Sequence, residues 1–273
     1  MKEVLVTGAA GSIGTMLREA YAGRYALRLT DRTPVRELRV GEGFVPGDVA
    51  VPDDMLRATA GVDAVIHLAG WPVEGDWPTV LAANIVGTHN VLEAARRNGV
   101  PRVVFASSNH AVGFYRRDET IDHHVYPKPD SRYGVSKVCG EALCSLYADR
   151  YGLSVFVVRI GHAAPAPVDV RRLAIWTSPR DLAQLVAIGL EHPDVRFEIV
   201  YGISGNKRAW YDNANARRLG YRPEDDSEAW AAELLARHVE HPDARIARYQ
   251  GGPFTVIEAG GDAPPAGDAQ SKG

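Results

Sequence analysis

Short apolar runs alternate with longer amphipathic segments along most of the chain. The apolar runs are nearly continuous, which is typical of strands buried on both faces of a parallel sheet. The pattern predicts strands over residues 4–6, 26–31, 43–48, 64–68, 102–106, 154–159 and 197–201. It predicts helices over residues 12–21, 79–98, 131–151, 179–191 and 227–238. This alternation favours a doubly wound α/β fold with a parallel sheet, the Rossmann type.

The pattern loosens after Ile160. Residues 163–168 contain two prolines and are predicted to form a loop. We expect a Rossmann core over residues 1–160 and a small substrate-binding region over residues 161–259 whose helices return to the core. Residues 260–273 are rich in Gly, Ala, Pro and Asp and lack bulky apolar side chains, so this tail is predicted to be disordered.

Composition excludes several classes of protein. The 273 residues are 45% hydrophobic and 24% charged, with a net charge of −3. These values are typical of a globular enzyme and argue against a nucleic-acid partner bound by a basic face. We expect no membrane span, no metal site and no signal peptide. Cys139 and Cys144, five apart on one predicted helix, point in different directions and cannot bridge. A cytoplasmic location is therefore expected.

Three glycines follow the first predicted strand with a spacing of three and three. Gly8 permits a tight turn, Gly11 lets the backbone approach a pyrophosphate, and Gly14 lets the helix pack closely on the strand. The amides of Ser12 and Ile13, at the start of that helix, then face the phosphates. A glycine triplet in this strand-to-helix context predicts a dinucleotide site.

An acidic residue, Asp31, closes the second predicted strand, 17 residues after Gly14. At this position a carboxylate accepts hydrogen bonds from the ribose hydroxyls of the adenosine half of a dinucleotide. It also repels the 2′-phosphate of NADP. Arg32 follows directly and could soften that preference. The predicted cofactor is NAD.

Tyr133 and Lys137 lie four apart on the helix predicted over residues 131–151. Side chains at this spacing share one helix face. A free tyrosine has a pKa of about 10 and is a weak base, but an ammonium and a positive nicotinamide ring both stabilise its phenolate. The chain has only five lysines, so a lysine at this spacing is informative. The pair predicts a tyrosine general base supported by Lys137.

Together these motifs resemble the extended, epimerase-like branch of the short-chain dehydrogenase/reductase superfamily, over roughly residues 1–240. Further matching segments are Gly47-Asp48-Val49, His67-Leu68-Ala69-Gly70, and Asn84 with Gly87-Thr88. The resemblance implies an NAD-binding core over residues 1–160. It also implies that NAD is contacted by Gly8, Gly11, Ser12, Ile13, Gly14, Asp31, Asp48, Val49, Leu68, Ala69, Gly70, Asn84, Tyr133, Lys137 and Ile160.

A finer similarity points to the uronate dehydrogenases. It is carried by residues 105–115, 159–161, 210–213 and 249–254. Members of that family oxidise glucuronate or galacturonate at C1 to an aldarolactone and form NADH. Most members of the superfamily carry Ser or Thr where this chain has Asn109, whereas uronate dehydrogenases share the asparagine.

The resemblance implies that Tyr133, Lys137 and Asn109 are catalytic. Ser108, Asn109 and His110 would hydrogen-bond to sugar hydroxyls. Arg171 would bind the uronate carboxylate, which suits a guanidinium because it offers two charge-assisted hydrogen bonds in parallel. A surface role for Arg171 stays open, and the adjacent Arg172 competes for the same assignment.

Two positions depart from the uronate dehydrogenases. Pro72 and His162 stand where the family has serines that touch the substrate. Proline donates no hydrogen bond, and His162 is bulkier, could carry a charge, and could instead only fill the wall of the pocket. The substrate could therefore be another uronate, another aldose or a modified sugar.

Two other functions remain open. A nucleotide-sugar epimerase is the nearest alternative, although sugar 4,6-dehydratases need an acidic pair where this chain has Asn109 and His110. A non-catalytic NAD(H) sensor typically lacks the tyrosine or the lysine. The helices over residues 79–98 and 131–151 commonly pair between subunits in the superfamily, so the resemblance implies a homo-oligomer, a dimer or larger.

Overall fold

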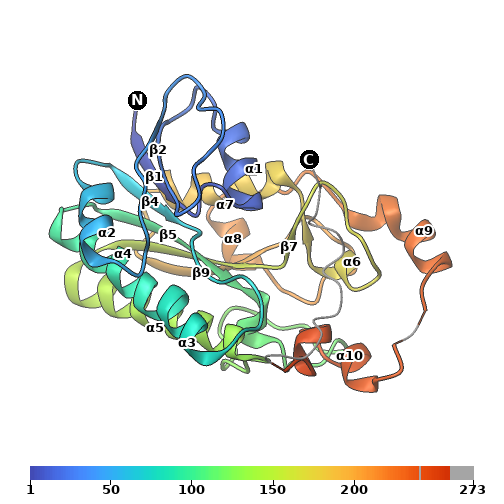
Figure 1. Ribbon diagram of the computed structural model, residues 1–273. Helices are drawn as coiled ribbons and strands as arrows, with labels where there is room; N and C mark the ends of the chain where they lie inside the picture. The colour runs from blue at the N-terminus through green and yellow to red at the C-terminus, as the bar shows by residue number, and fades with distance from the viewer. Residues whose placement is uncertain (240, 259–273) are drawn as a thin grey trace.

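A seven-stranded parallel sheet forms the centre of the computed structural model, which describes residues 1–239 and 241–258 (Figure 1). The strand order is β3-β2-β1-β4-β5-β6-β9, and each neighbouring pair is parallel. The strands are β1 (Glu3–Thr7), β2 (Ala26–Thr30), β3 (Glu42–Phe44), β4 (Ala64–His67), β5 (Arg102–Ser108), β6 (Ser154–Ile160) and β9 (Phe197–Gly202). The order reverses between β1 and β4, and ligands of such sheets bind at the carboxyl ends of the strands beside that point.

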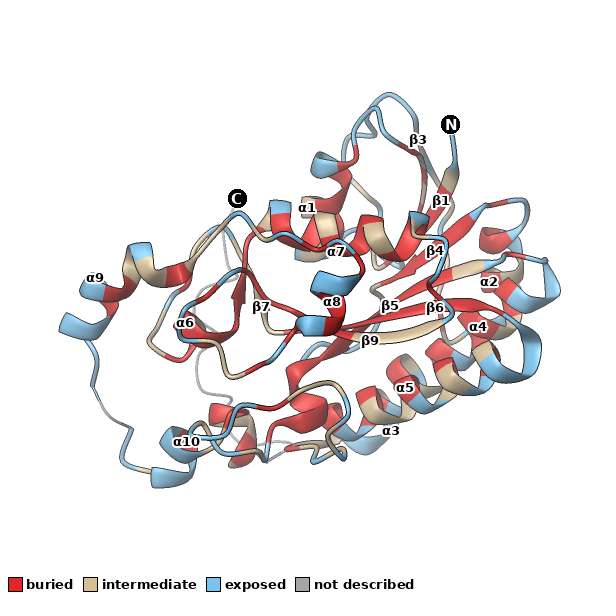
Figure 2. Ribbon diagram, turned by 180° about the vertical axis from the view of Figure 1, so that it is seen from behind, coloured by how far each residue is buried: buried red, intermediate tan, exposed pale blue. Residues whose placement is uncertain are grey.

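Helices cover both faces of the sheet, which confirms the predicted doubly wound fold. One face carries α1 (Ser12–Ala20), α7 (Pro179–Glu191) and α8 (Ala214–Arg218). The other carries α2 (Pro52–Thr59), α4 (Gly87–Arg97) and α5 (Arg132–Tyr151). The buried inner sides of these helices form two separate apolar cores with the strands between them (Figure 2).

Short elements gather beyond the carboxyl ends of the strands. They are α3 (Trp77–Val80), η1 (Leu81–Val86), η2 (Asn109–Val112), β7 (His162–Ala163), α6 (Arg172–Ile175), β8 (Trp176–Thr177), η3 (Ser227–Trp230), α9 (Ala231–Ala236), α10 (Ala244–Arg248) and η4 (Gly252–Thr255). A third apolar cluster holds several of them together and includes Val112, Ile175 and Tyr211. β9 and α7 come from beyond residue 160 but belong to the central sheet and its helical layer. A boundary at residue 160 between a Rossmann core and a substrate-binding region therefore stays a prediction.

The elements differ from the predicted ones in a few places. Helix α2 is absent from the prediction, although Pro52 at its first turn and two aspartates after it are ordinary start signals. The single helix predicted over residues 79–98 is interrupted by the π-helical turn η1. β3 ends at Phe44, short of residue 48, although the amides of Val45 and Gly47 still donate to the carbonyl oxygens of Leu29 and Asp31. The predicted tail over residues 260–273 lies outside the described residues.

Local signals that were predicted are also present. Ser178 caps α7 by accepting from the amide of Asp181 at 3.2 Å, and Gly99 follows α4 with a φ of +68°. Cys139 and Cys144 are free thiols.

Among the described residues, no helix is long and apolar enough to cross a membrane. The same residues contain no group of three metal-binding side chains arranged around one point.

Candidate active site

The glycine-rich loop between β1 and α1 has the close contacts that its sequence predicts. A Cβ on Gly8, whose φ is +70°, would lie 2.7 Å from the amide nitrogen of Ala69. One on Gly14 would lie 2.7 Å from the carbonyl oxygens of Gly8 and Ala9. Gly11 is the exposed N-cap of α1 and provides no side chain to cap it. The first amides of α1 therefore remain available to an anion.

Asp31 lies beside this loop with both carboxylate oxygens oriented by backbone amides. Oδ2 accepts from the amide of Ala10 at 3.1 Å, and Oδ1 accepts from the amide of Thr33 at 3.0 Å. The exposed side chain of Arg32 is drawn toward Asp48, with 3.8 Å between Nη1 and Oδ2.

The segment predicted to line the adenine is fixed against α4. Val49 is buried, and its carbonyl oxygen accepts from Asn90 Nδ2 at 2.9 Å. A Cβ on Gly87 would lie 2.7 Å from Val49 Cγ2, so α4 approaches this segment closely because residue 87 is glycine. Asp48 Oδ1 accepts from the amide of Ala50 at 2.9 Å, which stabilises the turn.

Asn84 connects the loop after β4 to the start of α5. It lies in the π-helical turn η1 with 2% of its surface exposed. Its Oδ1 accepts from the amide of Trp71 at 2.6 Å, and its Nδ2 donates to Ser136 Oγ at 2.8 Å. The segment Leu68–Gly70 is thereby fixed directly beside the glycine-rich loop, where Ala69 donates to Thr7 Oγ1 at 3.2 Å.

Tyr133 and Lys137 are both buried in the first turns of α5. Lys137 Nζ donates to the carbonyl oxygen of Ala106 at 2.8 Å and lies 5.5 Å from the centre of the Tyr133 ring. Burial lowers the pKa of Lys137 to about 8 and raises the pKa of Tyr133 to about 12. The protein groups around Tyr133 therefore favour its neutral phenol, and a positive nicotinamide ring beside it would lower its pKa.

The three residues at the end of β5 have different surroundings. Ser108 Oγ accepts from the amide of His110 at 3.2 Å. Asn109 is fully buried, and its side-chain amide contacts protein groups on both atoms. Nδ2 donates to the carbonyl oxygen of Ile160 at 3.2 Å, and Oδ1 accepts from Arg171 Nη2 at 3.0 Å. Both atoms of the Asn109 side-chain amide are thus committed to protein partners.

Arg171 is 91% buried, and no carboxylate among the described residues forms an ion pair with it. Its Nε donates to the carbonyl oxygen of Gln250 at 2.8 Å, and burial lowers its pKa to about 10. A Cβ on Gly252 would lie 2.7 Å from Arg171 Cδ. The competing residue, Arg172, is already paired with Asp169. The structure thus brings the unpaired arginine to Asn109 and leaves Arg172 committed elsewhere.

The two departures from the uronate dehydrogenases lie in different settings. His162 is partly buried in β7, and its Nε2 is enclosed without a partner. Burial, reinforced by Arg172, lowers its pKa to about 4, so His162 is neutral at physiological pH rather than charged. Pro72 is exposed on the loop after β4.

Other residues of this region carry no functional signal in the sequence. Asp130 contacts His110, with 2.7 Å between Oδ2 and Nδ1, and Phe254 stacks on the same ring at 3.8 Å. The hydroxyl of Tyr211 is buried beside Asn109 and Arg171. Asp130 stands in a Pro-Asp-Ser stretch before a helix, a composition typical of turns, so its sequence carries no functional signal.

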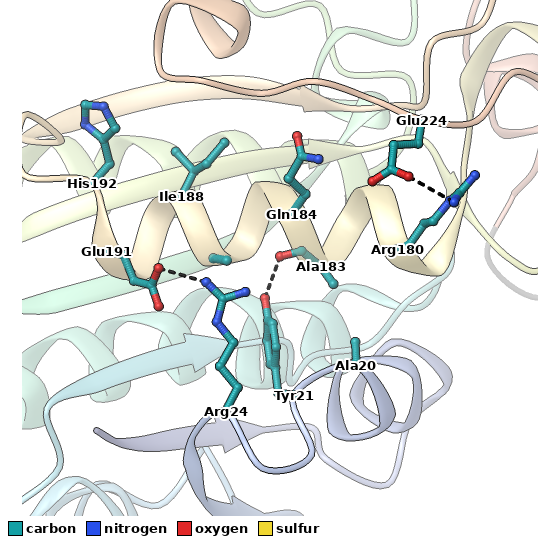
Figure 3. A pocket seen from close by; sticks show the side chains of 11 residues that line it. Ala20, Tyr21, Arg24, Arg180, Ala183, Gln184, Ile188, Glu191, His192 and Glu224 are labelled. Carbon is teal, nitrogen blue, oxygen red and sulfur yellow. Dashed lines mark hydrogen bonds and ion pairs between the residues drawn. The ribbon is translucent and has the colours of Figure 1, made fainter. Parts of the chain in front are cut away.

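A surface hollow of about 590 Å³ lies elsewhere, between α1 and α7 (Figure 3). Tyr21 donates to the carbonyl oxygen of Ala183 at 2.7 Å, and Arg24 pairs with Glu191 at 2.8 Å. None of the residues predicted from the sequence lines this hollow, and its charged groups pair with one another. The candidate active site is therefore the one at the carboxyl ends of the strands.

Comparisons with known proteins agree with this architecture. The model of the NAD dependent epimerase/dehydratase family matches residues 4–167. The uronate dehydrogenase of Pseudomonas putida is 44% identical over 256 residues, which are 93% of this chain and 95% of that protein. The NAD-dependent glucose-6-phosphate dehydrogenase of Haloferax volcanii is 40% identical, over 84% of this chain and 96% of that protein.

A solved structure shares the fold closely. A mutant of the uronate dehydrogenase from Agrobacterium tumefaciens, complexed with NAD, superposes with a TM-score of 0.91 at 37% identity, over 94% of this chain and 98% of that one. These matches confirm the resemblance inferred from the motifs. The chain belongs to the NAD dependent epimerase/dehydratase family.

Proposed function

We propose that this protein oxidises a hexuronic acid, such as glucuronate or galacturonate, at C1 to an aldarolactone with transfer of hydride to NAD. The observation that carries the proposal is Arg171, a buried guanidinium with no carboxylate partner in the described part of the chain. Arg171 contacts Asn109. The next residue, His110, has its ring centre 5.8 Å from that of Tyr133, so Arg171 lies near the proposed base. The carboxylate of a uronate and its reacting C1 would then occupy one site.

The hydrogen bonding of Arg171 supports a ligand of this charge. Nε and Nη2 donate to Gln250 and Asn109, whereas Nη1 has no protein partner and is not among the fully enclosed polar atoms. A buried cation without a counter-charge is unfavourable, and a carboxylate that reaches Nη1 supplies the missing charge.

The residues at the strand ends fit NAD. The close contacts at Gly8 and Gly14 hold the loop tightly between β1 and α1, and the uncapped start of α1 presents its amides to the pyrophosphate. Asp31 would accept from the adenosine ribose, and Asp48 and Val49 would line the adenine. Leu68, Ala69, Gly70, Asn84 and Ile160 would lie along the nicotinamide half. When bound, NAD supplies the hydride acceptor and a positive ring close to Tyr133.

Tyr133 acts as the general base. Its phenolate oxygen takes the proton of the C1 hydroxyl as the C1–H bond breaks and its electron pair leaves as hydride, so C1 becomes the lactone carbonyl. Lys137 stabilises the phenolate and holds the nicotinamide ribose. Ser108 and His110 hydrogen-bond to sugar hydroxyls, and Asn109 orients Arg171. The neutral His162 contributes a hydrogen bond or shape to the pocket rather than charge.

We propose that the protein acts in the cytoplasm, where the free thiols of Cys139 and Cys144 are stable. We also propose that it forms a homodimer. Val135 and Leu146, eleven positions apart on α5, share one helix face and are both exposed. Leu81 and Val86 are exposed on η1, which packs against α5. An apolar face of this kind supports subunit pairing, and sedimentation of the purified protein tests it.

A panel of substrates tests the proposed reaction. NADH formation is followed with glucuronate, galacturonate, glucose, glucose 6-phosphate and a nucleotide sugar. We expect kcat/KM for a uronate to exceed that for the matching neutral aldose by at least about a hundredfold, because the neutral sugar leaves Arg171 unpaired. Faster oxidation of neutral glucose, or epimerisation of the nucleotide sugar, would overturn the proposal.

A further inference from the structure

A buried carboxylate lies directly behind His110. Asp130 Oδ2 is 2.7 Å from His110 Nδ1, and the Asp130 side chain is completely enclosed. Its other oxygen, Oδ1, accepts from Ser131 Oγ at 2.8 Å. No arginine or lysine of the described chain pairs with Asp130. The carboxylate is thus committed to His110 rather than to a structural ion pair.

Three glycines from separate segments make room for this carboxylate. A Cβ on Gly113 or on Gly251 would overlap Asp130 Oδ2, and one on Gly134 would lie 3.2 Å from Oδ1. The three positions follow η2, precede η4 and begin α5, and the amide of Gly251 donates to the carbonyl oxygen of Gly113 at 2.8 Å. The backbone is therefore built closely around the carboxylate.

The imidazole ring of His110 is also held from its face. Phe254 stacks on it with 3.8 Å between ring centres and an angle of 26° between the planes. The ring of Tyr133 approaches it edge-on at 5.8 Å. With Asp130 at one nitrogen and Phe254 on one face, His110 has a fixed position and a fixed ring orientation.

The hydrogen bond also determines which ring nitrogen carries the proton. An ionised carboxylate only accepts hydrogen bonds, so Nδ1 of His110 must be the donor. Nε2 is then the nitrogen that remains for a ligand, since it has no protein partner and is not among the fully enclosed polar atoms. In the neutral ring Nε2 is a hydrogen-bond acceptor.

We propose that Asp130 is a positioning residue that fixes His110 as the Nδ1–H tautomer, with Nε2 accepting a hydrogen bond from a sugar hydroxyl of the substrate. This inference rests on the proposed function, because it needs His110 to contact the sugar. It assigns a role to a carboxylate that touches neither the substrate nor the cofactor. Its effect on catalysis therefore passes through one imidazole ring.

A double-mutant cycle tests that dependence. Asp130→Asn keeps the size of the side chain inside the glycine-lined space but removes its charge. We expect it to lower kcat/KM for the sugar by at least about tenfold, with the KM for NAD unchanged. In a His110→Gln background the same change should alter kcat/KM by less than about twofold. Asp118→Asn, which affects only an exposed pair with Arg116, is the matched control.

The cycle has two results that would overturn the proposal. Equal losses in both backgrounds mean that Asp130 acts through the fold rather than through His110, and no loss in the wild-type background means that it does not act at all. If the wild type oxidises a sugar other than a uronate, the proposed function fails while the same cycle, run with that sugar, still decides the role of Asp130.

Nitrogen NMR of the histidines tests the tautomer without any sugar. In the NAD-bound wild type, the resonances that His110→Gln removes should show a protonated Nδ1 and an unprotonated Nε2. In Asp130→Asn the Nδ1 proton should exchange faster with water, because the acceptor has lost its charge. An Nε2–H tautomer in the wild type would contradict the proposal directly.

Discussion

Arg171 donates from Nη2 to Oδ1 of Asn109 at 3.0 Å, so the residue that follows β5 orients the unpaired guanidinium of the site. The same amide donates from Nδ2 to the carbonyl oxygen of Ile160 at 3.2 Å. A side-chain amide offers a donor and an acceptor on different atoms and can make both contacts at once. A serine or threonine hydroxyl would have to accept from Arg171 and donate to Ile160 through a single oxygen. This difference gives a physical reason for asparagine at this position.

The role of Tyr133 can be tested by removing its hydroxyl alone. Tyr133→Phe should lower kcat by at least about a hundredfold, the usual contribution of a general base, with NAD affinity unchanged. Tyr147→Phe is the matched control, since Tyr147 lies on the same helix and donates to Glu93 Oε2 at 3.0 Å, outside the site. Single-turnover kinetics with a saturating sugar would measure the effect. Near-normal turnover in Tyr133→Phe would refute the assignment.

Lys137 should leave a signature in the pH dependence of stability. Burial lowers its pKa from 10.5 to about 8, so between these values the unfolded chain binds more protons than the folded one. The contribution of Lys137 to the free energy of unfolding should therefore rise with pH across this window, by about 3 kcal/mol at most.

Urea unfolding of wild type and Lys137→Met at a series of pH values measures that contribution. The difference in free energy of unfolding between them should shift in favour of the wild type as the pH rises from 8 toward 10.5. A difference that stays constant with pH would show that Lys137 titrates normally in the fold.

The cofactor preference should depend on Asp31. Both of its carboxylate oxygens are oriented by amides beside the glycine-rich loop, so Asp31→Ala removes a fixed ribose acceptor and a negative charge. We expect the wild type to prefer NAD over NADP, and Asp31→Ala to reduce the ratio of the two kcat/KM values by about tenfold or more. Asp53→Ala, at an exposed position of α2, should leave the ratio unchanged.

The close packing at Gly14 predicts a contrast between two glycine substitutions. A Cβ on Gly14 meets two carbonyl oxygens at 2.7 Å, whereas one on Gly43 meets nothing within 4 Å. Gly14→Ala should lower stability by about 1–3 kcal/mol, as overpacking does, and weaken NAD binding. Gly43→Ala should change neither. Thermal melts with and without NAD measure both effects, and equal behaviour of the two variants would contradict the packing argument.

The predictable parts of this structure are those that local sequence encodes. Gly8, Gly14 and Asp31 are positioned by a strand, a turn and the start of a helix, so their spacing alone indicates a dinucleotide loop. Tyr133 and Lys137 share a helix face by periodicity. The sheet follows from apolar runs, and all its strands but the short β3 lie close to the predicted ranges.

The parts that sequence reasoning missed depend on contacts between distant residues. Asp130 reaches His110, and Gln250 reaches Arg171, through loops whose composition is that of ordinary turns. The π-helical turn that carries Asn84 has no compositional signal. Burial also reverses simple expectations, since it raises the pKa of Tyr133 and makes His162 neutral. Such effects appear only when the surrounding side chains are in place.

In the proposed reaction Arg171 binds the carboxylate of a sugar acid, and Arg171→Ala removes that contact. The measurement is kcat/KM for glucuronate, glucose and glucose 6-phosphate in the wild type, in Arg171→Ala, and in Arg172→Ala as the control whose partner is Asp169.

Losing one side of a buried ion pair costs about 3–5 kcal/mol. Arg171→Ala should therefore reduce glucuronate oxidation by a few hundredfold or more while changing glucose oxidation little, and Arg172→Ala should preserve the wild-type preference for glucuronate. A wild type that prefers glucose, or one that prefers glucose 6-phosphate, would contradict this role of Arg171, as would unchanged glucuronate kinetics in Arg171→Ala.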